Sequence, residues 1–487
     1  MKRHKTENTP SKSLTFELLI SDRQQIGSNG DALMIDYLFL LRRLRSVALL
    51  FLFCCPVVAD DWKGWMGDNR DGVYRETGII NEITSEGLRV KWRKAIGSGY
   101  AGPSVSENRV FVFDYEKQSG DAFNDPGERA SVQGSERITA FNGSSGEILW
   151  QHTYECNYSI SYPAGPRCTP TIDGKNIYTL GAEGDLRCLR VDDGTLLWHF
   201  NLKERFAIEA PLWGFASHPL IVNDLLYTAV GGTGQGVVAF DKNTGEVRWK
   251  SLDAKSSYCP LTLISIDQQP QLICFHPNGV SSLNPNNGAI FWTIPIQPDY
   301  EMSIASPVVE GNRMFASSIR TEAVMLQLTN NGKPQVQELW RGEPKNAVHC
   351  ANSTPLFVNG VVYGTDCNDG NLVAVDAQNG SQLWTTFQPT KPDETRYIRH
   401  GTAFITRVGD SNRYFLMSES GDLIIAELSA EEYQEKGRFH VLEPTSECFG
   451  RSVVWSHPAY AQKTLFARND KEIVAVSLAQ GDKPSSN

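Results

Sequence analysis

The stretch from Val237 to Trp249 reads VVAFDKNTGEVRW and contains the unit that the chain repeats. Its first four residues are apolar, as in a short buried strand, and the residues from Glu246 onward fit a second strand. Between them, the Asp241 side chain can accept hydrogen bonds from backbone amides, and Gly245 supplies a backbone angle that other residues adopt at a cost. The pattern Ala-x-Asp-x-x-Thr-Gly-x-x-x-Trp therefore predicts a tight β-hairpin.

This hairpin pattern recurs at a nearly constant spacing. Copies of it, two close and two weaker, end at Trp150, Trp384, Trp198 and Trp292. Trp340 keeps the aromatic residue without the glycine turn. Counted from Trp92, the tryptophans that end these strands are 58, 48, 51, 43, 48 and 44 residues apart. A repeat of about this length, built from short strands, is typical of a β-propeller.

Each copy also has a front half, consisting of a Pro-led strand, a turn and an apolar strand. One copy therefore supplies the four strands of one blade. Leu88 to Ile96 (LRVKWRKAI) is a lone closing strand, and the last blade, which begins at His457-Pro458, lacks a Trp-ending strand. We expect the lone strand to complete that blade and close the ring. The predicted fold is all-β, an eight-bladed β-propeller of four-stranded blades. The turn ESGD at 419–422 also parallels AEGD at 182–185 and NDGN at 368–371.

The repeats divide the 487 residues into one large closed domain, expected over 88–480, and shorter flanking parts. Residues 60–87 should wrap under or across the propeller, and residues 481–487 should form a disordered tail. The net charge is −10, and charges of both signs are interspersed. Without a basic stripe, we expect no nucleic-acid partner. We expect a monomer.

The N-terminal region has the order of a secretory signal. Residues 1–33 are polar, three arginines lie between 42 and 45, an apolar run follows from Val47 to Phe53, and small residues end at Ala59. We predict cleavage after Ala59 and a true start at Met34, with the mature chain in the periplasm or outside the cell. The apolar run is short for a membrane span, so we expect no transmembrane segment in the mature chain.

The cysteines and one insertion leave alternatives open. The eight cysteines beyond the signal could form disulfides or be buried thiols on blade strands; they are Cys156, Cys168, Cys188, Cys259, Cys274, Cys350, Cys367 and Cys448. No C-x-x-C pair occurs among them, so we expect no metal site of that kind. The insertion from Tyr115 to Arg137 includes the acidic residues Asp121, Asp125, Glu128 and Glu136. Their spacing lacks a regular oxygen-ligand pattern, which favours a solvated loop over a calcium loop.

Polar and aromatic residues recur in the loops that join one blade to the next. In a propeller these loops lie on one face and reach the central funnel, so the repeat register predicts a ligand pocket with aromatic walls and some cationic groups. The candidate ligand-binding residues are Tyr162, Arg167, Trp213, His218, Glu301, Asn352, Arg399, His400, Arg451, Trp455 and His457. Three of the arginines, Arg167, Arg399 and Arg451, would suit an anionic ligand. The alternative is that these residues brace the funnel and one another.

Two of the candidates are histidines in equivalent repeat positions. His218 and His457 both precede a blade-opening proline. A single such histidine is more often a satisfied core residue. The repetition makes a metal or acid–base role worth testing.

The repeat unit resembles the tryptophan-docking motif of pyrroloquinoline quinone (PQQ) repeats. Such repeats occur in quinoprotein alcohol dehydrogenases and in an outer-membrane assembly lipoprotein with the same propeller. The resemblance covers about residues 88–478, and PLWGFASHP (211–219), RSVVWSHP (451–458) and ARNDKEIVAV (467–476) resemble secreted bacterial PQQ-like repeat proteins. It implies the propeller fold and says little about chemistry, because the Trp and Gly are structural.

The resemblance to the dehydrogenases implies further groups that this chain lacks as motifs. It implies a quinone stacked between a Trp and a disulfide of adjacent cysteines, calcium held by Glu and Asn, and an Asp base. The only adjacent cysteines, Cys54 and Cys55, lie in the predicted signal, and no Cys-x-x-Cys-His haem motif occurs. No calcium or base residue can be carried over by a matching motif. The cofactor therefore stays unknown, with PQQ and calcium as one possibility.

Two functions from different classes remain. The first is an exported, non-catalytic propeller that binds a small molecule, a glycan or a protein at its funnel. The second is a PQQ-dependent oxidoreductase of the alcohol or sugar dehydrogenase type. In the second, Trp213 or Trp455 would be the stacking platform and Glu301 or His457 the base. The sequence identifies no catalytic residue.

Overall fold

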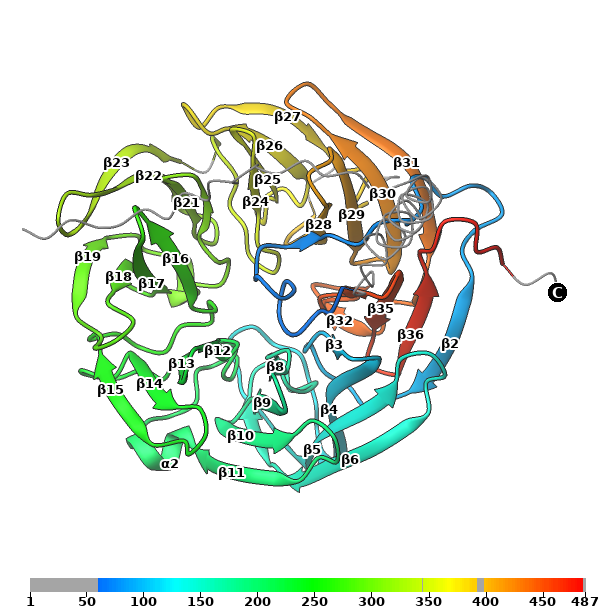
Figure 1. Ribbon diagram of the computed structural model, residues 1–487, viewed down its shortest axis with the longest axis horizontal. Coiled ribbons are helices and arrows are strands. Elements are labelled where there is room, and N and C mark those ends of the chain that lie inside the picture. The colour runs from blue at the N-terminus through cyan, green and yellow to red at the C-terminus, as the bar shows by residue number, and fades with distance from the viewer. Residues whose placement is uncertain (1–59, 344, 392–397, 485–487) are drawn as a thin grey trace, which may run out of the picture. The chain divides into compact units, whose positions relative to one another are not determined.

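The computed structural model describes residues 60–343, 345–391 and 398–484. The predicted signal, the start at Met34 and the cleavage site after Ala59 lie outside these residues. Within them, the strands form eight sheets around a ring, as Figure 1 shows, which confirms the eight-bladed propeller. No helix of the described residues is long and apolar enough to cross a membrane.

Blades 1 to 4 follow one another along the chain. Blade 1 contains β3 (Ser104–Ser106), β4 (Arg109–Gly120), β5 (Ala130–Asn142) and β6 (Ile148–Glu155), with β7 (Tyr158–Ile160) paired to β5. Blade 2 contains β8 (Thr171–Asp173), β9 (Asn176–Leu180), β10 (Asp185–Arg190) and β11 (Leu196–Asn201), followed by α2 (Leu202–Phe206). Blade 3 contains β12 (Leu220–Val222), β13 (Leu225–Ala229), β14 (Val237–Asp241) and β15 (Val247–Ser251). Blade 4 contains β16 (Thr262–Ile266), β17 (Gln269–His276), β18 (Gly279–Leu283) and β19 (Ile290–Ile294).

Blades 5 to 8 complete the ring. After the short helix η1 (Asp299–Glu301), blade 5 contains β20 (Val308–Glu310), β21 (Arg313–Ser317), β22 (Ala323–Asn330) and β23 (Pro334–Gly342). Blade 6 contains β24 (Leu356–Val358), β25 (Val361–Thr365), β26 (Leu372–Asp376) and β27 (Gln382–Thr386). Blade 7 contains β28 (Ala403–Val408), β29 (Arg413–Ser418), β30 (Asp422–Leu428) and β31 (Tyr433–His440), and the hairpin of β32 (Ser446–Cys448) and β33 (Arg451–Val453) follows it. Blade 8 contains β34 (Ala459–Ala461), β35 (Thr464–Arg468), β36 (Glu472–Ser477) and β2 (Val90–Ala95).

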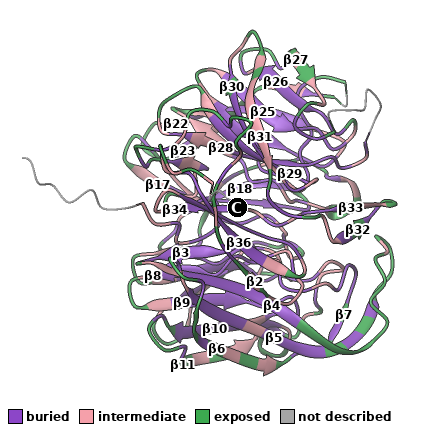
Figure 2. Ribbon diagram, turned by 90° about the vertical axis from the view of Figure 1, so that its right-hand side faces the viewer, coloured by how far each residue is buried: buried purple, intermediate pink, exposed green. Residues whose placement is uncertain are grey.

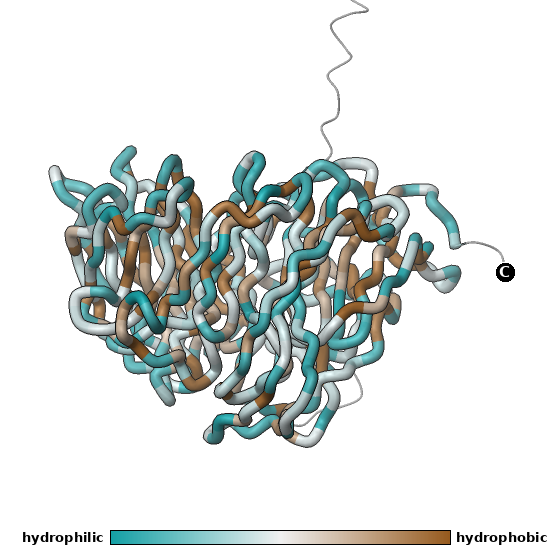
Figure 3. The backbone as a smooth tube through the Cα atoms, turned by 90° about the horizontal axis from the view of Figure 1, so that it is seen from below, coloured by the Kyte–Doolittle hydropathy of each residue, from teal (hydrophilic) through white to brown (hydrophobic). Residues whose placement is uncertain are grey.

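The ring closes through the strand that the sequence singled out. Strand β2 pairs antiparallel with β36, so the N-terminal strand is the outer strand of the last blade. The middle strands of the blades are almost entirely buried, whereas the outer strands alternate between covered and exposed residues. The tube in Figure 3 is accordingly brown mainly along the strands and teal at many of the turns.

Six of the repeated tryptophans join their own blade to the next, whereas Trp292 bonds to Gln271 in its own blade. The indole N–H of Trp150 donates to the carbonyl of Val191 in blade 2 at 2.9 Å, and Trp198 and Trp249 make equivalent bonds to Lys242 and Pro285. The turn glycine of the next blade lies under the ring. Gly194, for example, has φ +69°, and a Cβ there would be 2.5 Å from the Trp150 ring. The glycine is therefore required by backbone angle and by close approach together.

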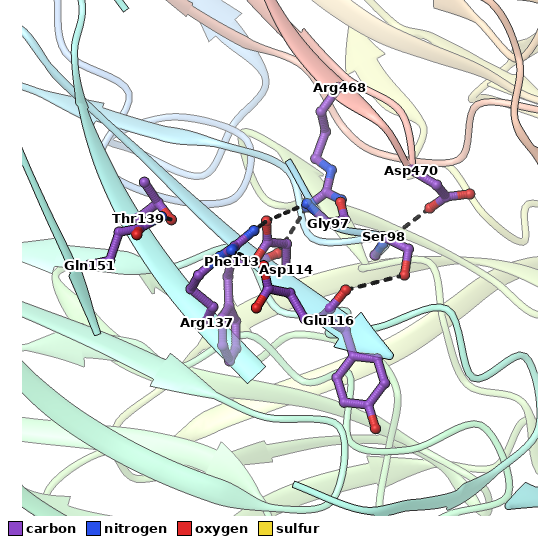
Figure 4. A network of polar contacts seen from close by, with 12 residues as sticks. Gly97, Ser98, Phe113, Asp114, Glu116, Arg137, Thr139, Gln151, Arg468 and Asp470 are labelled. Carbon is purple, nitrogen blue, oxygen red and sulfur yellow. Dashed lines mark hydrogen bonds and ion pairs between the residues drawn. The ribbon is translucent and has the colours of Figure 1, made fainter. Parts of the chain in front are cut away.

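A buried polar network links blade 8 to blade 1, where the ring closes (Figure 4). Arg468 is fully buried and donates to the carbonyls of Gly97 at 2.7 Å and Phe113 at 2.9 Å. Beside it, the Asp114 carboxylate accepts from the Gly97 amide at 2.6 Å and from Arg137 at 2.8 and 3.0 Å. Hydrogen bonds to carbonyl oxygens thus replace the water that Arg468 loses on burial, and bonds from the Gly97 amide and Arg137 do the same for Asp114.

The segment before β2 packs against the propeller near the centre of the ring, where Figure 1 draws it in blue. Strand β1 (Val73–Tyr74) pairs parallel with β28. Arg70 donates to the carbonyls of Leu261 at 3.0 Å and Pro219 at 2.6 Å. At the other end of the chain, Asp482 pairs with Arg89 at 3.0 Å.

The insertion in blade 1 is a long hairpin arm, which differs from the solvated loop we expected. Strands β4 and β5 continue past the blade, and β4 becomes exposed from Glu116 onward (Figure 2). Only residues 121–129 form the loop. Glu136 lies on β5, fully buried, and accepts hydrogen bonds from the Tyr154 and Tyr158 hydroxyls and the Ala182 amide. Glu136 therefore does not belong to a loop site.

All eight cysteines of the described residues are free and buried. Burial is the first cause that raises the pKa of these thiols, for example that of Cys188 and Cys448 to about 12. Of the two alternatives, the structure therefore supports buried thiols.

Candidate functional site

The loops between blades surround a cavity of about 900 Å³ at the funnel. Seven of the predicted residues line it: Tyr162, Trp213, Glu301, Asn352, Arg399, His400 and Trp455. A smaller cavity of about 200 Å³ shares Tyr162, Trp213, Asn352 and Trp455 with it and adds Arg167, His218 and His457. Arg451 lines neither cavity. The repeat register thus brings ten of the eleven candidates to one place.

Six Tyr, Trp and Phe side chains contribute to the wall of the larger cavity, beside aliphatic and polar residues. Trp213 and Tyr258 are edge to face, with ring centroids 5.7 Å apart. Tyr162 packs with Trp213 and Trp455 in a small cluster, and its hydroxyl is 3.4 Å from the Cys448 sulfur. Such a wall favours a ligand with apolar or planar parts.

Two of the three candidate arginines already bind other groups of the protein. Arg167 donates to the carbonyls of Ser161 at 2.9 Å and Tyr162 at 2.6 Å, and so fixes its own loop. Arg451 pairs with Glu419, with its Nε 2.7 Å from the carboxylate. For these two residues the bracing alternative holds.

The candidate histidines His218 and His457 are neutral and are packed against Trp65. Trp65 stacks on His218 with centroids 5.3 Å apart, and the Trp65 indole N–H donates to His457 Nε2 at 3.4 Å. His218 Nδ1 also accepts from the Thr169 amide at 2.8 Å. Burial lowers the pKa of His457 to about 3 and holds the pKa of His218 well below its usual value. Both histidines therefore anchor the N-terminal segment.

The third candidate histidine, His400, is neutral because of burial and also because of neighbouring positive charges. Burial, and then three nearby arginines led by Arg399, lowers the pKa of His400 to about 4. Its ring stacks on Phe449, at the tip of the β32–β33 hairpin, with centroids 5.2 Å apart. His400 can therefore accept or donate a hydrogen bond without adding charge to the cavity.

Glu301 lies on the exposed rim and already has a partner. Lys255 Nζ is 2.7 Å from both of its carboxylate oxygens. Tyr300 and Glu301 both have positive φ, 56° and 58°, and Tyr300 is 67% exposed. This strained rim presents an aromatic ring to solvent at the mouth of the cavity.

The described residues do not fit a calcium-bound quinone of the dehydrogenase kind. No disulfide of adjacent cysteines is available there, because the eight cysteines are free and separate in sequence. Nor do the described residues bring three His, Cys, Asp or Glu side chains together where a metal ion could bind.

The sequence did not predict how the funnel loops are held. In four blades an acidic residue of the turn between the second and third strands accepts from a backbone amide of the loop that enters the same blade. The pairs are Glu183 with Ser159 at 2.6 Å, Glu322 with Gln297 at 2.9 Å, Asp366 with His349 at 2.8 Å and Glu419 with Thr402 at 3.1 Å. The parallel AEGD and ESGD turns were a signal for these pairs.

The arm of blade 1 also contributes to the cavity, which the sequence did not predict. Pro126, Gly127 and Arg129 line the cavity from this arm. The Asn124 side chain donates to the Glu447 carbonyl at 2.7 Å, so the arm touches the β32–β33 hairpin. The arm of blade 1 and the hairpin between blades 7 and 8 therefore meet beside the funnel.

Comparisons with known proteins agree with this architecture. A family model described as outer membrane protein assembly factor BamB matches residues 134–386 and 334–486. The chain is 24% identical over 345 residues to the outer membrane protein assembly factor BamB of Moranella endobia (strain PCIT), which covers 66% of this chain and 78% of the relative. Two solved structures share the fold. BamB from Moraxella catarrhalis has a TM-score of 0.51 and 14% identity, covering 79% of this chain and 98% of its own. A europium-containing methanol dehydrogenase has a TM-score of 0.56 and 12% identity, covering 86% and 89%.

Proposed function

Because the chain belongs to the family described as outer membrane protein assembly factor BamB, we propose that it is an exported, non-catalytic propeller that binds a ligand or partner at its central funnel. The observation that carries this proposal is the cavity of about 900 Å³, to which loops from successive blades contribute aromatic side chains. A volume of this size is within the range of ligand sites. The names of the relatives make a polypeptide the first partner to test.

The state of the candidate acid–base groups supports a binding role. A general base needs a free carboxylate or imidazole within reach of the substrate. Glu301 is paired with Lys255, and His457 is held against Trp65. The remaining candidates of the funnel are aromatic or amide side chains and occupied arginines, apart from Arg399 and the neutral histidines His218 and His400.

The proposed compartment follows from the same family and from the signal expected before Asp60. We place the mature chain in the periplasm or outside the cell. Fractionation of cells that produce the full chain, with N-terminal sequencing of the mature product, checks this placement. A product that keeps residues 1–59 in the cytoplasm would contradict it.

A complementation experiment tests the function. Cells that lack the chain receive the wild type, Trp213→Ala or Leu383→Ala, and the amount of folded outer-membrane proteins is measured. Leu383 is a matched control, because it is 41% exposed on the outer strand β27, away from the funnel. We expect only Trp213→Ala to fail, while its melting temperature stays near that of the wild type. Full rescue by Trp213→Ala would refute a role for the funnel. Dye reduction by the purified chain with PQQ and calcium would instead favour the oxidoreductase.

A further inference from the structure

The cationic side chains that line the larger cavity differ in whether they already bind another group of the protein. There are four among the described residues, Arg129, Lys255, Arg320 and Arg399. Three of them have partners: Arg129 on the carbonyls of Ser159 and Ala210, Lys255 on Glu301, and Arg320 on Asp299. Arg399 is the exception.

No hydrogen-bond or ion-pair partner of Arg399 is found in the part of the chain that the structure describes. Its Nε is buried and unpaired. The guanidinium lies over the Phe449 ring, 4.8 Å from the centroid, and this contact holds the group in place without satisfying its donors. A buried donor without a partner costs free energy, and a charged donor costs more. The cavity therefore keeps one oriented cation ready for an anion.

Two other polar residues that line the cavity, His400 and Ser256, carry no charge that would compete with Arg399. His400 is neutral, and its ring stacks on Phe449, the residue whose ring also lies under the Arg399 guanidinium. Ser256 also lines the cavity, and its buried hydroxyl has no partner among the described residues. Two residues that line the cavity, Arg399 and Ser256, therefore each have a buried polar atom without a partner among the described residues, and the rest of the lining is mainly aromatic and aliphatic.

We propose that the funnel ligand carries a carboxylate that pairs with Arg399 and an apolar or aromatic body that lies against Trp213 and Tyr258. This rests on the binding role proposed above and specifies its chemistry. The flat fork of one guanidinium matches the two oxygens of a carboxylate, and one unmatched positive charge balances one negative charge. The carboxylate can come from a free organic acid or from an acidic end of a polypeptide.

Matched probes distinguish charge from shape. Calorimetric titrations of the purified full chain use indole-3-acetate against indole-3-acetamide, and the peptide acetyl-Ala-Trp-Ala as free acid against its C-terminal amide. Each pair differs in charge and hardly in size. We expect the acid to bind about tenfold or more tightly than the amide, as a charge-assisted bond to a guanidinium gives. Preference for the small acid or for the peptide acid identifies the source of the carboxylate.

Variants locate the effect. Arg399→Gln should abolish the preference for the acid, and Arg399→Lys should retain part of it, because the charge stays while the fork is lost. Arg248→Gln is the control for net charge: Arg248 lies on the outer strand β15, is 56% exposed and pairs with Asp241. It should bind all probes like the wild type.

The outcomes separate this proposal from the function on which it rests. Equal binding of acid and amide, lost in Trp213→Ala, overturns the anion subsite and leaves the funnel as a binding site. Unchanged acid preference in Arg399→Gln also overturns it. If none of the four probes binds at millimolar concentration, this proposal is wrong, and the complementation experiment alone decides the role of the funnel.

Discussion

Arg468 should be the residue on which closure of the ring depends most. Its side chain is 0% exposed and donates to three carbonyls, those of Gly97 at 2.7 Å, Phe113 at 2.9 Å and Asn469 at 3.2 Å. The substitution Arg468→Met keeps most of the volume and removes every donor. The carbonyls on both sides of the seam between blades 8 and 1 then lose their partner.

The magnitude follows from the number of bonds. Each buried acceptor left without a partner costs about 1–3 kcal/mol, so the loss of three bonds should cost about 3–9 kcal/mol of the free energy of unfolding. In a chain of about 400 folded residues, this corresponds to a fall of about 4–11 °C in melting temperature. Arg468→Lys keeps the charge but cannot bond to both sides of the seam, so it should lose about half as much.

The assay is thermal unfolding followed by circular dichroism, with Arg248→Met as the control. Arg248 is exposed and makes one surface ion pair, so its loss should cost no more than about 1 kcal/mol. If Arg468→Met melts within about 1 °C of the wild type, the bonds across the seam contribute nothing net. The account of how the ring closes would then be wrong.

Three further predictions concern other buried contacts. Burial raises the pKa of Glu136 to about 7, above its ordinary 4.5, so the stability that its protonated form gives is complete below about pH 4.5 and is lost as the pH rises through about 7. Glu136→Gln should therefore reduce the change in urea-unfolding free energy between pH 5 and pH 8 by up to about 3 kcal/mol. An unchanged difference would refute this. Gly194→Ala should cost about 2–4 kcal/mol, because its Cβ would meet the Trp150 ring at 2.5 Å, whereas Gly174→Ala, also at positive φ with nothing within 4 Å, should cost about 1 kcal/mol; equal melting temperatures would show that the close approach is unimportant. Trp65→Ala should cost about 3–5 kcal/mol, since Trp65 is 3% exposed and covers two buried histidines, and melting that matches the wild type would contradict its role as an anchor.

The sequence predicted the fold because its signals are local and repeated. The hairpin around Asp241 and Gly245 depends on turn chemistry, and the same pattern at each copy fixes the number of blades. The closing role of Leu88–Ile96 followed from counting strands. These inferences need no knowledge of which distant residues touch.

The sequence predicted where the candidate site lies, but it did not predict the contacts that the residues of the site make. The repeat register placed ten candidates around two adjoining cavities. The sequence could not show that Arg167 bonds to its own loop, or that Glu419 occupies Arg451, because both depend on how loops fold back. For the same reason Arg399 became distinct from the other arginines only once the partners of all of them were known.

The most direct test of the central claim is photocrosslinking of the full chain in its own cells. A photoreactive amino acid replaces Tyr300 at the mouth of the funnel or Ile290 on the outer strand β19, which are 67% and 50% exposed. If the funnel is where the partner binds, position 300 should form a defined covalent adduct that Trp213→Ala removes, and position 290 should not. Adducts that form equally at both positions, or persist in Trp213→Ala, would contradict the account.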